Sequence, residues 1–281
     1  MQRASMLKWI GIITVLTGVS LTGINIYGLF HTIRPAVFFS DELRFKDDIT
    51  LTLQQTEQAI NRKKNESPQQ YASRITKVIA SGIAHIKWDD YDSRRFNQLV
   101  PIWDNYFLYF MGKYSGIPEF QRYHFANYQR SINRGIGICG DASMIMSQLL
   151  DKQNIKNQII TFPGHVILAA KFADGSEKSY DPDFGVIIDK SPEELKINHK
   201  SIGKLYTAAG YTANDQRIMS RIYNNHFERW NGVKHFITNK YYFEKITYLL
   251  KWPLPLLLIF IGLFKSIKIE IQKRRIKKGK Q

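Results

Sequence analysis

The chain is uniformly apolar near both ends and mixed in polarity between them. Residues 9–30 read WIGIITVLTGVSLTGINIYGLF and contain no charged side chain. About 20 apolar residues in a helix are enough to cross the hydrocarbon core of a membrane. We therefore expect an N-terminal transmembrane anchor within residues 1–30. The alternative is a cleaved signal peptide, which would have a shorter apolar part and a small-residue cleavage site, and no good site of that kind follows in HTIRPAVFFS.

A second apolar segment, residues 246–267, reads ITYLLKWPLPLLLIFIGLFKSI. Its uncharged part, residues 252–264, would span only about 20 Å as a helix, so a full crossing must include residues 246–250. Lys251 would then reach toward the membrane surface along its aliphatic stem, and the two prolines would fall in a first turn or at a kink. A re-entrant or surface-lying segment is the alternative.

Positive charge gathers beside these two segments. Residues 1–30 contain two Lys or Arg and no acid, whereas residues 246–281 contain nine Lys or Arg and one Glu, so together they carry +10 of the formal +16. Lys and Arg accumulate on the cytoplasmic side of spanning helices. We therefore expect two passes through the inner (plasma) membrane, with both termini and the basic tail 268–281 in the cytoplasm. Residues 31–245 would then be extracytoplasmic, in the periplasm of a cell envelope. The excess charge is thus explained by the membrane, and nucleic acid is not an expected partner.

The part between the two spans divides into three by pattern. Helical periodicity predicts a helical region over residues 31–130 and another over residues 191–245. Capping boxes that begin at Ser67 and Ser191 mark the two clearest helix starts. Between these regions, residues 131–190 mix one helix with alternating strands, which indicates an α+β core.

The only cysteine, Cys139, lies in RGIGICGDASMIMSQLL, where a glycine-rich turn meets an amphipathic helix. The apolar face of that helix recurs with helical spacing at Ile138, Ala142, Ile145 and Leu149. Cys139 is then at or near the helix N-terminus, where backbone N–H groups and the helix dipole stabilise a thiolate over a thiol. In an oxidising compartment a single thiol has no intramolecular disulfide partner. It is either buried and inert or retained for its chemistry.

A β-hairpin is predicted in GHVILAAKFADGSEKSYDPDFG, with one strand over residues 165–172 and its return over residues 176–181. His165 begins the first strand and Asp181 ends the second. The two ends of an antiparallel pair are neighbours, so a histidine and a carboxylate that are distant in sequence come together.

The register decides which acid meets the histidine. A three-residue loop with Gly175 as the left-handed residue sets Asp181 opposite Ile167, on the same face as His165. A two-residue Asp-Gly loop would turn Asp181 to the other face. Asp183 would lie directly opposite His165 if the strand continued, but Pro182 argues that pairing stops first. Asp181 is therefore the expected partner and Asp183 the reserve.

These motifs resemble the core of the transglutaminase-like superfamily, the papain-like Cys-His-Asp cysteine enzymes, in the segments GICGDAS, GHVILAAKFADG and YDPDFG of residues 131–190. The resemblance implies a Cys-bearing helix packed on an antiparallel sheet, with Cys139 as nucleophile, His165 as base and Asp181 as its orienter. It implies no metal and no cofactor. Family members often have an aromatic residue after the histidine, where this chain has Val166, which affects the expected substrate more than the triad. The family includes enzymes that cleave peptides or amides, enzymes that cross-link glutamine to amines, and members without catalysis.

The sequence therefore predicts a membrane-anchored cysteine peptidase, amidase or transamidase that acts on peptide or protein amides. The backbone N–H of Cys139 is the nearest donor for the developing oxyanion, and Gln129 or Asn133 could add a side-chain donor. The alternative is a catalytically idle adaptor of the same fold that binds a cell-envelope polymer or a partner protein.

Overall fold

The computed structural model describes residues 2–35, 49–86 and 92–278. The chain divides into two compact units: residues 1–33, 99–122 and 243–281 form the first, and residues 34–98 and 123–242 form the second. The helices of the first unit are α1 (Gln2–Leu29), α4 (Tyr106–Tyr114), α5 (Pro118–Gln121), α11 (Thr238–Leu250, most of it) and α12 (Pro253–Lys278). Those of the second are α2 (Leu53–Ala59), α3 (Pro68–Gly82), α6 (Tyr128–Arg134), α7 (Cys139–Asp151), α8 (Pro192–Ala208), α9 (Ala213–Tyr223) and α10 (Gly232–Phe236).

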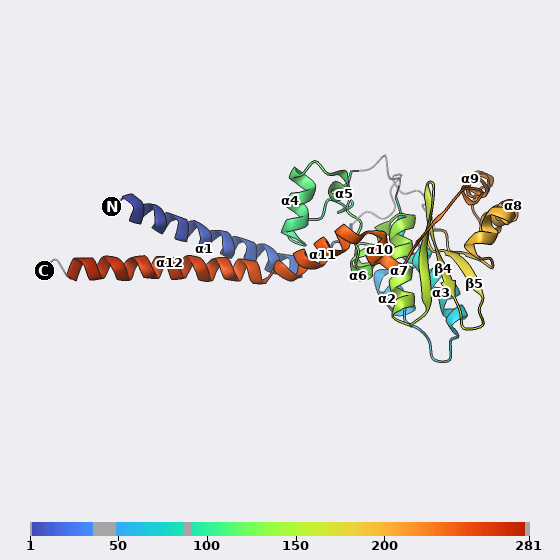
Figure 1. The fold of residues 1–281 in the computed structure, drawn as a ribbon, viewed down its shortest axis with the longest axis horizontal. Helices are drawn as coiled ribbons and strands as arrows, with labels where there is room; N and C mark the ends of the chain where they lie inside the picture. The colour runs from blue at the N-terminus through green and yellow to red at the C-terminus, as the bar shows by residue number, and fades with distance from the viewer. Residues whose placement is uncertain (1, 36–48, 87–91, 279–281) are drawn as a thin grey trace. The chain divides into compact units, whose positions relative to one another are not determined.

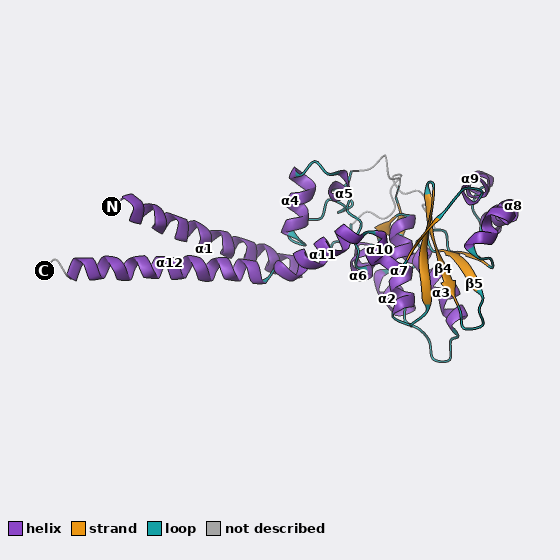
Figure 2. Cartoon of the chain, in the orientation of Figure 1, coloured by secondary structure: helices purple, strands orange, loops and turns teal. Residues whose placement is uncertain are grey.

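The second unit is built on a five-stranded antiparallel sheet with strand order β6-β5-β4-β3-β7 (Figure 2). Its strands are β3 (Lys156–Phe162), β4 (His165–Lys171), β5 (Glu177–Asp181), β6 (Val186–Ile188) and β7 (Glu228–Trp230). A separate parallel pair joins β1 (Ala84–His85) to β2 (Ile136–Gly137). The α+β class predicted from the sequence is confirmed.

Two of the regions expected to be helical also contribute strands. β7 lies within residues 191–245 and forms an edge of the main sheet, and β1 lies within residues 31–130. Both strands are too short to show an alternating pattern, so periodicity alone does not detect them. Residues 99–122 also group with the terminal helices rather than with the rest of region 31–130. The division by sequence pattern therefore differs from the division by contacts.

Helices cover both faces of the sheet. Leu168 and Ala170 of β4 pack in a cluster with α3 and α7, while Ile167 and Ala169 pack in another with α8 and α9. Figure 1 shows α7 on one side of β4 and β5, with α8 and α9 on the other. A strand that is buried on both faces reads as a continuous apolar run, which explains the sequence HVILAA. This arrangement fixes both the helix that carries Cys139 and the hairpin that carries His165.

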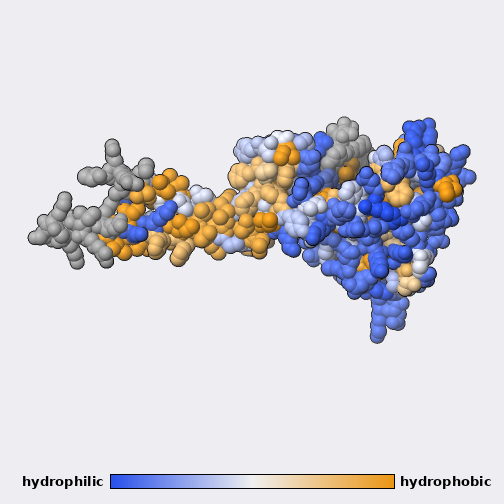
Figure 3. Space-filling view, viewed as in Figure 1, coloured by the Kyte–Doolittle hydropathy of each residue, from blue (hydrophilic) through white to orange (hydrophobic). Residues whose placement is uncertain are grey.

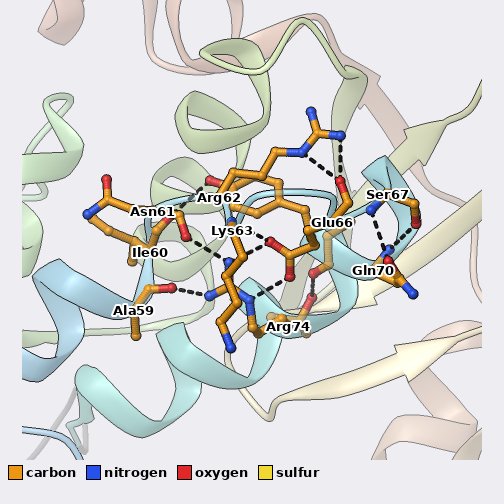
Figure 4. A network of polar contacts seen from close by, with 12 residues as sticks. Ala59, Ile60, Asn61, Arg62, Lys63, Glu66, Ser67, Gln70 and Arg74 are labelled. Carbon is orange, nitrogen blue, oxygen red and sulfur yellow. Dashed lines mark hydrogen bonds and ion pairs between the residues drawn. The ribbon is translucent and has the colours of Figure 1, made fainter.

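The predicted helix start at Ser67 is confirmed and is reinforced by an ion pair. Ser67 and Gln70 form the capping box of α3. Figure 4 shows Arg74 beside it, with Nε 2.6 Å from Glu66 Oε1 and with further bonds to the carbonyls of Ala59 and Asn61. The Arg74 hydrogen bond is the largest influence on Glu66 and, despite partial burial, lowers its pKa to about 2. The loop between α2 and α3 is thereby tied down. The capping box at Ser191 is also present, at the start of α8.

The first unit contains a close pair of antiparallel helices, α1 and α12. A Cβ added to Gly18 of α1 would lie 2.6 Å from the carbonyl oxygen of Pro255, and one added to Gly11 would lie 3.2 Å from that of Gly262. Small residues permit such close backbone approach between two helices. Figure 3 shows apolar residues covering this helix pair. Among the described residues, one helix, Leu7–Leu29, is long and apolar enough to cross a membrane by length and composition.

The second apolar segment is not one continuous helix. α11 ends at Leu250 and α12 begins at Pro253, so the expected span 246–267 is interrupted at Lys251 and Trp252. Proline lacks an N–H and is favoured in the first turn of a helix, which explains the new start. Lys251 is held in place by the protein: its Nζ donates to the Asp104 carbonyl at 2.5 Å, and its own carbonyl accepts from Asn25 Nδ2 at 2.5 Å.

Candidate active site

Cys139 is the first residue of α7, as predicted. Gly135 ends the preceding helix α6 in the left-handed region, with φ +69°, which favours glycine. The chain then pairs with β1, where His85 lies opposite Gly137, and enters α7 through extended backbone at Ile138. Cys139 is partly exposed. The first N–H groups of a helix have no partner within it, so the sulfur lies beside backbone donors.

The hairpin has the register predicted with the Gly175 bulge. Phe172 N donates to Ser176 O at 2.9 Å, and Gly175 has φ +83°. Leu168 lies opposite Tyr180, so continuing the register sets Asp181 opposite Ile167, on the His165 face. His165 Nε2 is 2.7 Å from Asp181 Oδ2. The choice of Asp181 over Asp183 as the partner of the ring is therefore confirmed.

Asp181 is held on both of its oxygens. Its Oδ1 accepts from the backbone N–H groups of Asp183 at 3.1 Å and Phe184 at 3.3 Å, and its Oδ2 accepts from Tyr206 Oη at 2.6 Å. Burial, and then the negative charge of Asp181, raise the pKa of Tyr206 well above its usual value. Tyr206 therefore stays neutral and donates. These bonds fix the carboxylate, which in turn orients the imidazole.

His165 brings Asp181 and Cys139 together. Its Nε2 donates to Asp181, which leaves Nδ1 as the nitrogen available to the sulfur. Burial lowers the pKa of His165, but the charge and hydrogen bond of Asp181 and the contact with Cys139 outweigh it, so the pKa lies well above the usual value. An imidazolium beside the sulfur stabilises a thiolate. His165 and Asp181 are buried, whereas Cys139 is partly exposed, so Cys139 is the most accessible of the three residues.

Sequence reasoning missed a second pair at this site. His85 Nε2 lies 2.8 Å from Asp183 Oδ1, and both side chains are buried. Tyr206, which bonds Asp181, was missed as well. Neither His85 nor Tyr206 belongs to a motif, because both reach the site by tertiary packing of β1 and α8. Asp183 alone had been singled out, as the reserve partner of His165.

A third pair lies behind the start of α7. His124 Nδ1 is 2.7 Å from Asp141 Oδ2, which also accepts from Ile138 N at 3.1 Å. Asp141 Oδ1 is 3.7 Å from the guanidinium of Arg134, whose side chain is fully buried. Burial raises the pKa of Asp141, but the His124 and Arg134 charges and these hydrogen bonds reverse the effect, so the pKa is lowered. This network fixes the turn that presents Cys139. The candidate oxyanion donors Gln129 and Asn133 have exposed side chains on α6.

A separate cavity of about 570 Å³ is lined by residues that include Lys156, Lys171 and Glu177. Lys171 and Glu177 are at the opposite ends of β4 and β5 from His165 and Asp181, so this cavity does not belong to the triad. Its lining mixes acidic, basic and amide side chains.

Comparison with protein families, with curated proteins and with solved structures finds no match to this chain.

Proposed function

We propose that the chain is a cysteine enzyme of transglutaminase-like type that attacks the carbonyl carbon of an amide or peptide bond. The observation that supports it most directly is the order of contacts at one site, from a partly exposed Cys139 through a buried His165 to a buried, fully bonded Asp181. A base that is oriented by a third group is the general design of an activated nucleophile.

In the proposed reaction, the Cys139 thiolate forms a bond to the carbonyl carbon and the carbonyl electrons move onto oxygen. The backbone N–H of Cys139 at the start of α7 stabilises this oxyanion. The tetrahedral intermediate then expels the amine, which takes the proton of His165, and a thioester remains. Water or a second amine gives a proton to His165 and attacks the thioester. The acid or new amide leaves, and the thiolate is regenerated.

The test uses the fact that Cys139 is the only cysteine in the chain. A thiol-directed electrophile such as iodoacetamide should add one adduct per chain at neutral pH, and Cys139→Ser should add none. His165→Gln should slow the labelling by about 10-fold or more, because the thiolate loses its cation. His226→Gln is the matched control, since His226 is exposed on a loop. Equal labelling rates in the His165 and His226 variants would reject the enzyme and favour the idle adaptor.

We also propose that the chain crosses the membrane twice, with both termini in the cytoplasm and residues 31–245 outside. The contacts of Gly11 and Gly18 support this, because α12 lies along α1 and would share its membrane environment. The charges of the tail 268–281 set the orientation. A reporter that works only outside the cytoplasm should be active when fused near residue 150 and silent when fused after Gln281. The reverse pattern would reject the topology.

A further inference from the structure

The site holds one more ligand group than the triad uses. The Cys139 sulfur, a ring nitrogen of His165 and a carboxylate oxygen of Asp183 lie within 4.8 Å of one another. Asp183 has no part in the proposed reaction, because Asp181 already orients the ring. Thiolate, imidazole and carboxylate are the three ligand types that bind zinc in proteins.

We propose that Cys139, His165 and Asp183 also form a binding site for a divalent cation of the zinc class, and that the bound cation blocks the nucleophile. This inference rests on the proposed function, because it describes how that same site is switched off. Binding joins the sulfur and the His165 nitrogen to the metal and releases the proton that they share. The sulfur lone pair is then committed to the metal and cannot attack a carbonyl.

The groups that would orient each ligand are already in place. His165 is fixed through Nε2 by Asp181 at 2.7 Å, which leaves its other nitrogen for a metal. Asp183 Oδ1 lies 2.8 Å from His85 Nε2, so the carboxylate has a histidine beside it that would help to orient it. Histidine and carboxylate ligands of zinc are typically held in this way by a partner on their far side, and loss of such a partner weakens binding.

Charge and size agree with a dication. A thiolate and a carboxylate supply two negative charges, and the buried His165 and Asp183 lie close to the partly exposed Cys139 at the start of α7. In a tetrahedral zinc site, bonds of about 2.0 to 2.3 Å place ligand atoms roughly 3.5 Å apart. The three ligand atoms lie within 4.8 Å of one another, so side-chain rotations that close the site by about 1 Å would reach this geometry. Three protein ligands leave the fourth position to water.

The experiment uses the full chain in detergent micelles. Zinc binding is measured by competition with a chromogenic chelator, and Co²⁺ is added separately to look for the charge-transfer absorption of a thiolate–cobalt bond. Wild-type protein should bind one Zn²⁺ per chain and show the cobalt band. Zinc should slow iodoacetamide labelling of Cys139 at least 10-fold, and EDTA should restore the rate.

Asp183→Asn should weaken zinc binding at least 10-fold and remove the protection, with each variant compared with its own metal-free labelling rate. Asp189→Asn is the matched control, because Asp189 is an exposed acid near the same turn, with its side chain 81% exposed, and it should behave as wild type. Should Asp183→Asn fail to fold, the cobalt band of the wild-type protein and its loss in Cys139→Ser decide the question.

The two proposals fail in different ways. Normal labelling of Cys139 without zinc protection and without a cobalt band would overturn the metal site and leave the proposed enzyme intact. Stoichiometric zinc binding to a thiol that stays unreactive in EDTA would overturn the enzyme and leave the metal site. Protection that is equal in wild type and Asp183→Asn would overturn the assignment of Asp183 as a ligand.

Discussion

Of the three His–Asp pairs near Cys139, two have the same separation and different surroundings: His165–Asp181, the first pair below, and His124–Asp141, the second pair below. His165 and Asp181 are 2.7 Å apart at the open end of the hairpin, and His124 and Asp141 are 2.7 Å apart behind the start of α7. A ring nitrogen of the first histidine lies within 4.8 Å of the Cys139 sulfur. In the second pair, Asp141 instead accepts from the backbone of Ile138 and faces a buried arginine.

The comparison shows that the pair itself does not define a catalytic site. What differs is the third group: a nucleophile in one case, a helix start and a buried cation in the other. Under the proposed function, the hairpin pair would serve the chemistry, and the His124 pair would hold the turn that carries Cys139. The two assignments predict opposite responses to the same substitution.

The largest expected difference is between His165→Gln and His124→Gln. The first removes the acid–base group and should abolish turnover of an amide substrate, with a loss on the order of 1,000-fold or more. The second leaves the triad intact and should change turnover per folded molecule only a few-fold. Rates are normalised to folded protein by circular dichroism. Comparable losses of turnover in both variants would show that the second pair also takes part in the chemistry.

Asp141→Asn should have the largest effect on stability. It removes the negative charge that faces Arg134, whose side chain is fully buried, and breaking such a pair from one side costs about 3 kcal/mol or more. Urea denaturation measures the loss. Asp174→Asn, in the exposed hairpin turn, is the control and should leave the free energy of unfolding close to that of the wild type.

An unfolding free energy in Asp141→Asn within error of the control would contradict a structural role for the second pair. It would mean that the charge of Asp141 is not needed to hold Arg134.

Tyr206→Phe tests the support of the first pair and should have a moderate effect. It removes the hydroxyl that donates to Asp181 Oδ2 at 2.6 Å and keeps the ring in the core. The hydroxyl also forms a hydrogen bond with Tyr223 Oη at 2.5 Å, so the variant loses two hydrogen bonds. Loss of the one to a charged group costs about 1.5 to 3 kcal/mol, so the protein should be less stable by at least about that amount. Turnover should fall by roughly 10-fold because the imidazole is less firmly oriented. A variant with unchanged turnover would show that the two backbone N–H groups hold Asp181 by themselves.

The first pair could be predicted from the sequence and the second could not, for a physical reason. A hairpin brings its two ends together by local geometry, so the Gly175 loop alone placed Asp181 beside His165. The helix start at Cys139 could also be predicted, because a glycine-rich turn precedes it and the apolar residues after it recur with helical spacing. His124 reaches Asp141 only because the segment before α6 folds back on α7. The spacing of apolar residues along the sequence does not predict a tertiary contact of this kind.

The same limit explains the errors in the fold. The edge strand β7 is three residues long and is defined by pairing with β3. Pro253 does begin a helix, one of the two positions that the sequence allowed, but the contacts of Lys251 with Asp104 and Asn25 could not be predicted. Elements that are stabilised by their own sequence pattern were predicted, and elements that are stabilised by distant partners were not.

The smallest expected effect comes from the ion pair Glu66–Arg74, which lies nearer the surface. Its contribution to stability can be compared with those of the two buried His–Asp pairs. Its atoms are 2.6 Å apart, but the Arg74 side chain is 21% exposed, so solvent screens the pair and Glu66→Gln should cost about 1 kcal/mol or less. Because folding lowers the pKa of Glu66 from 4.5 to about 2, the stabilisation is complete above pH 4.5 and is lost as the pH falls toward 2. Urea midpoints at pH 7 and at pH 3 measure it, with the exposed Glu57→Gln as control. The difference in urea midpoint between wild type and Glu66→Gln should be smaller at pH 3 than at pH 7. A larger difference at pH 3 would show that the Glu66–Arg74 ion pair does not cause it.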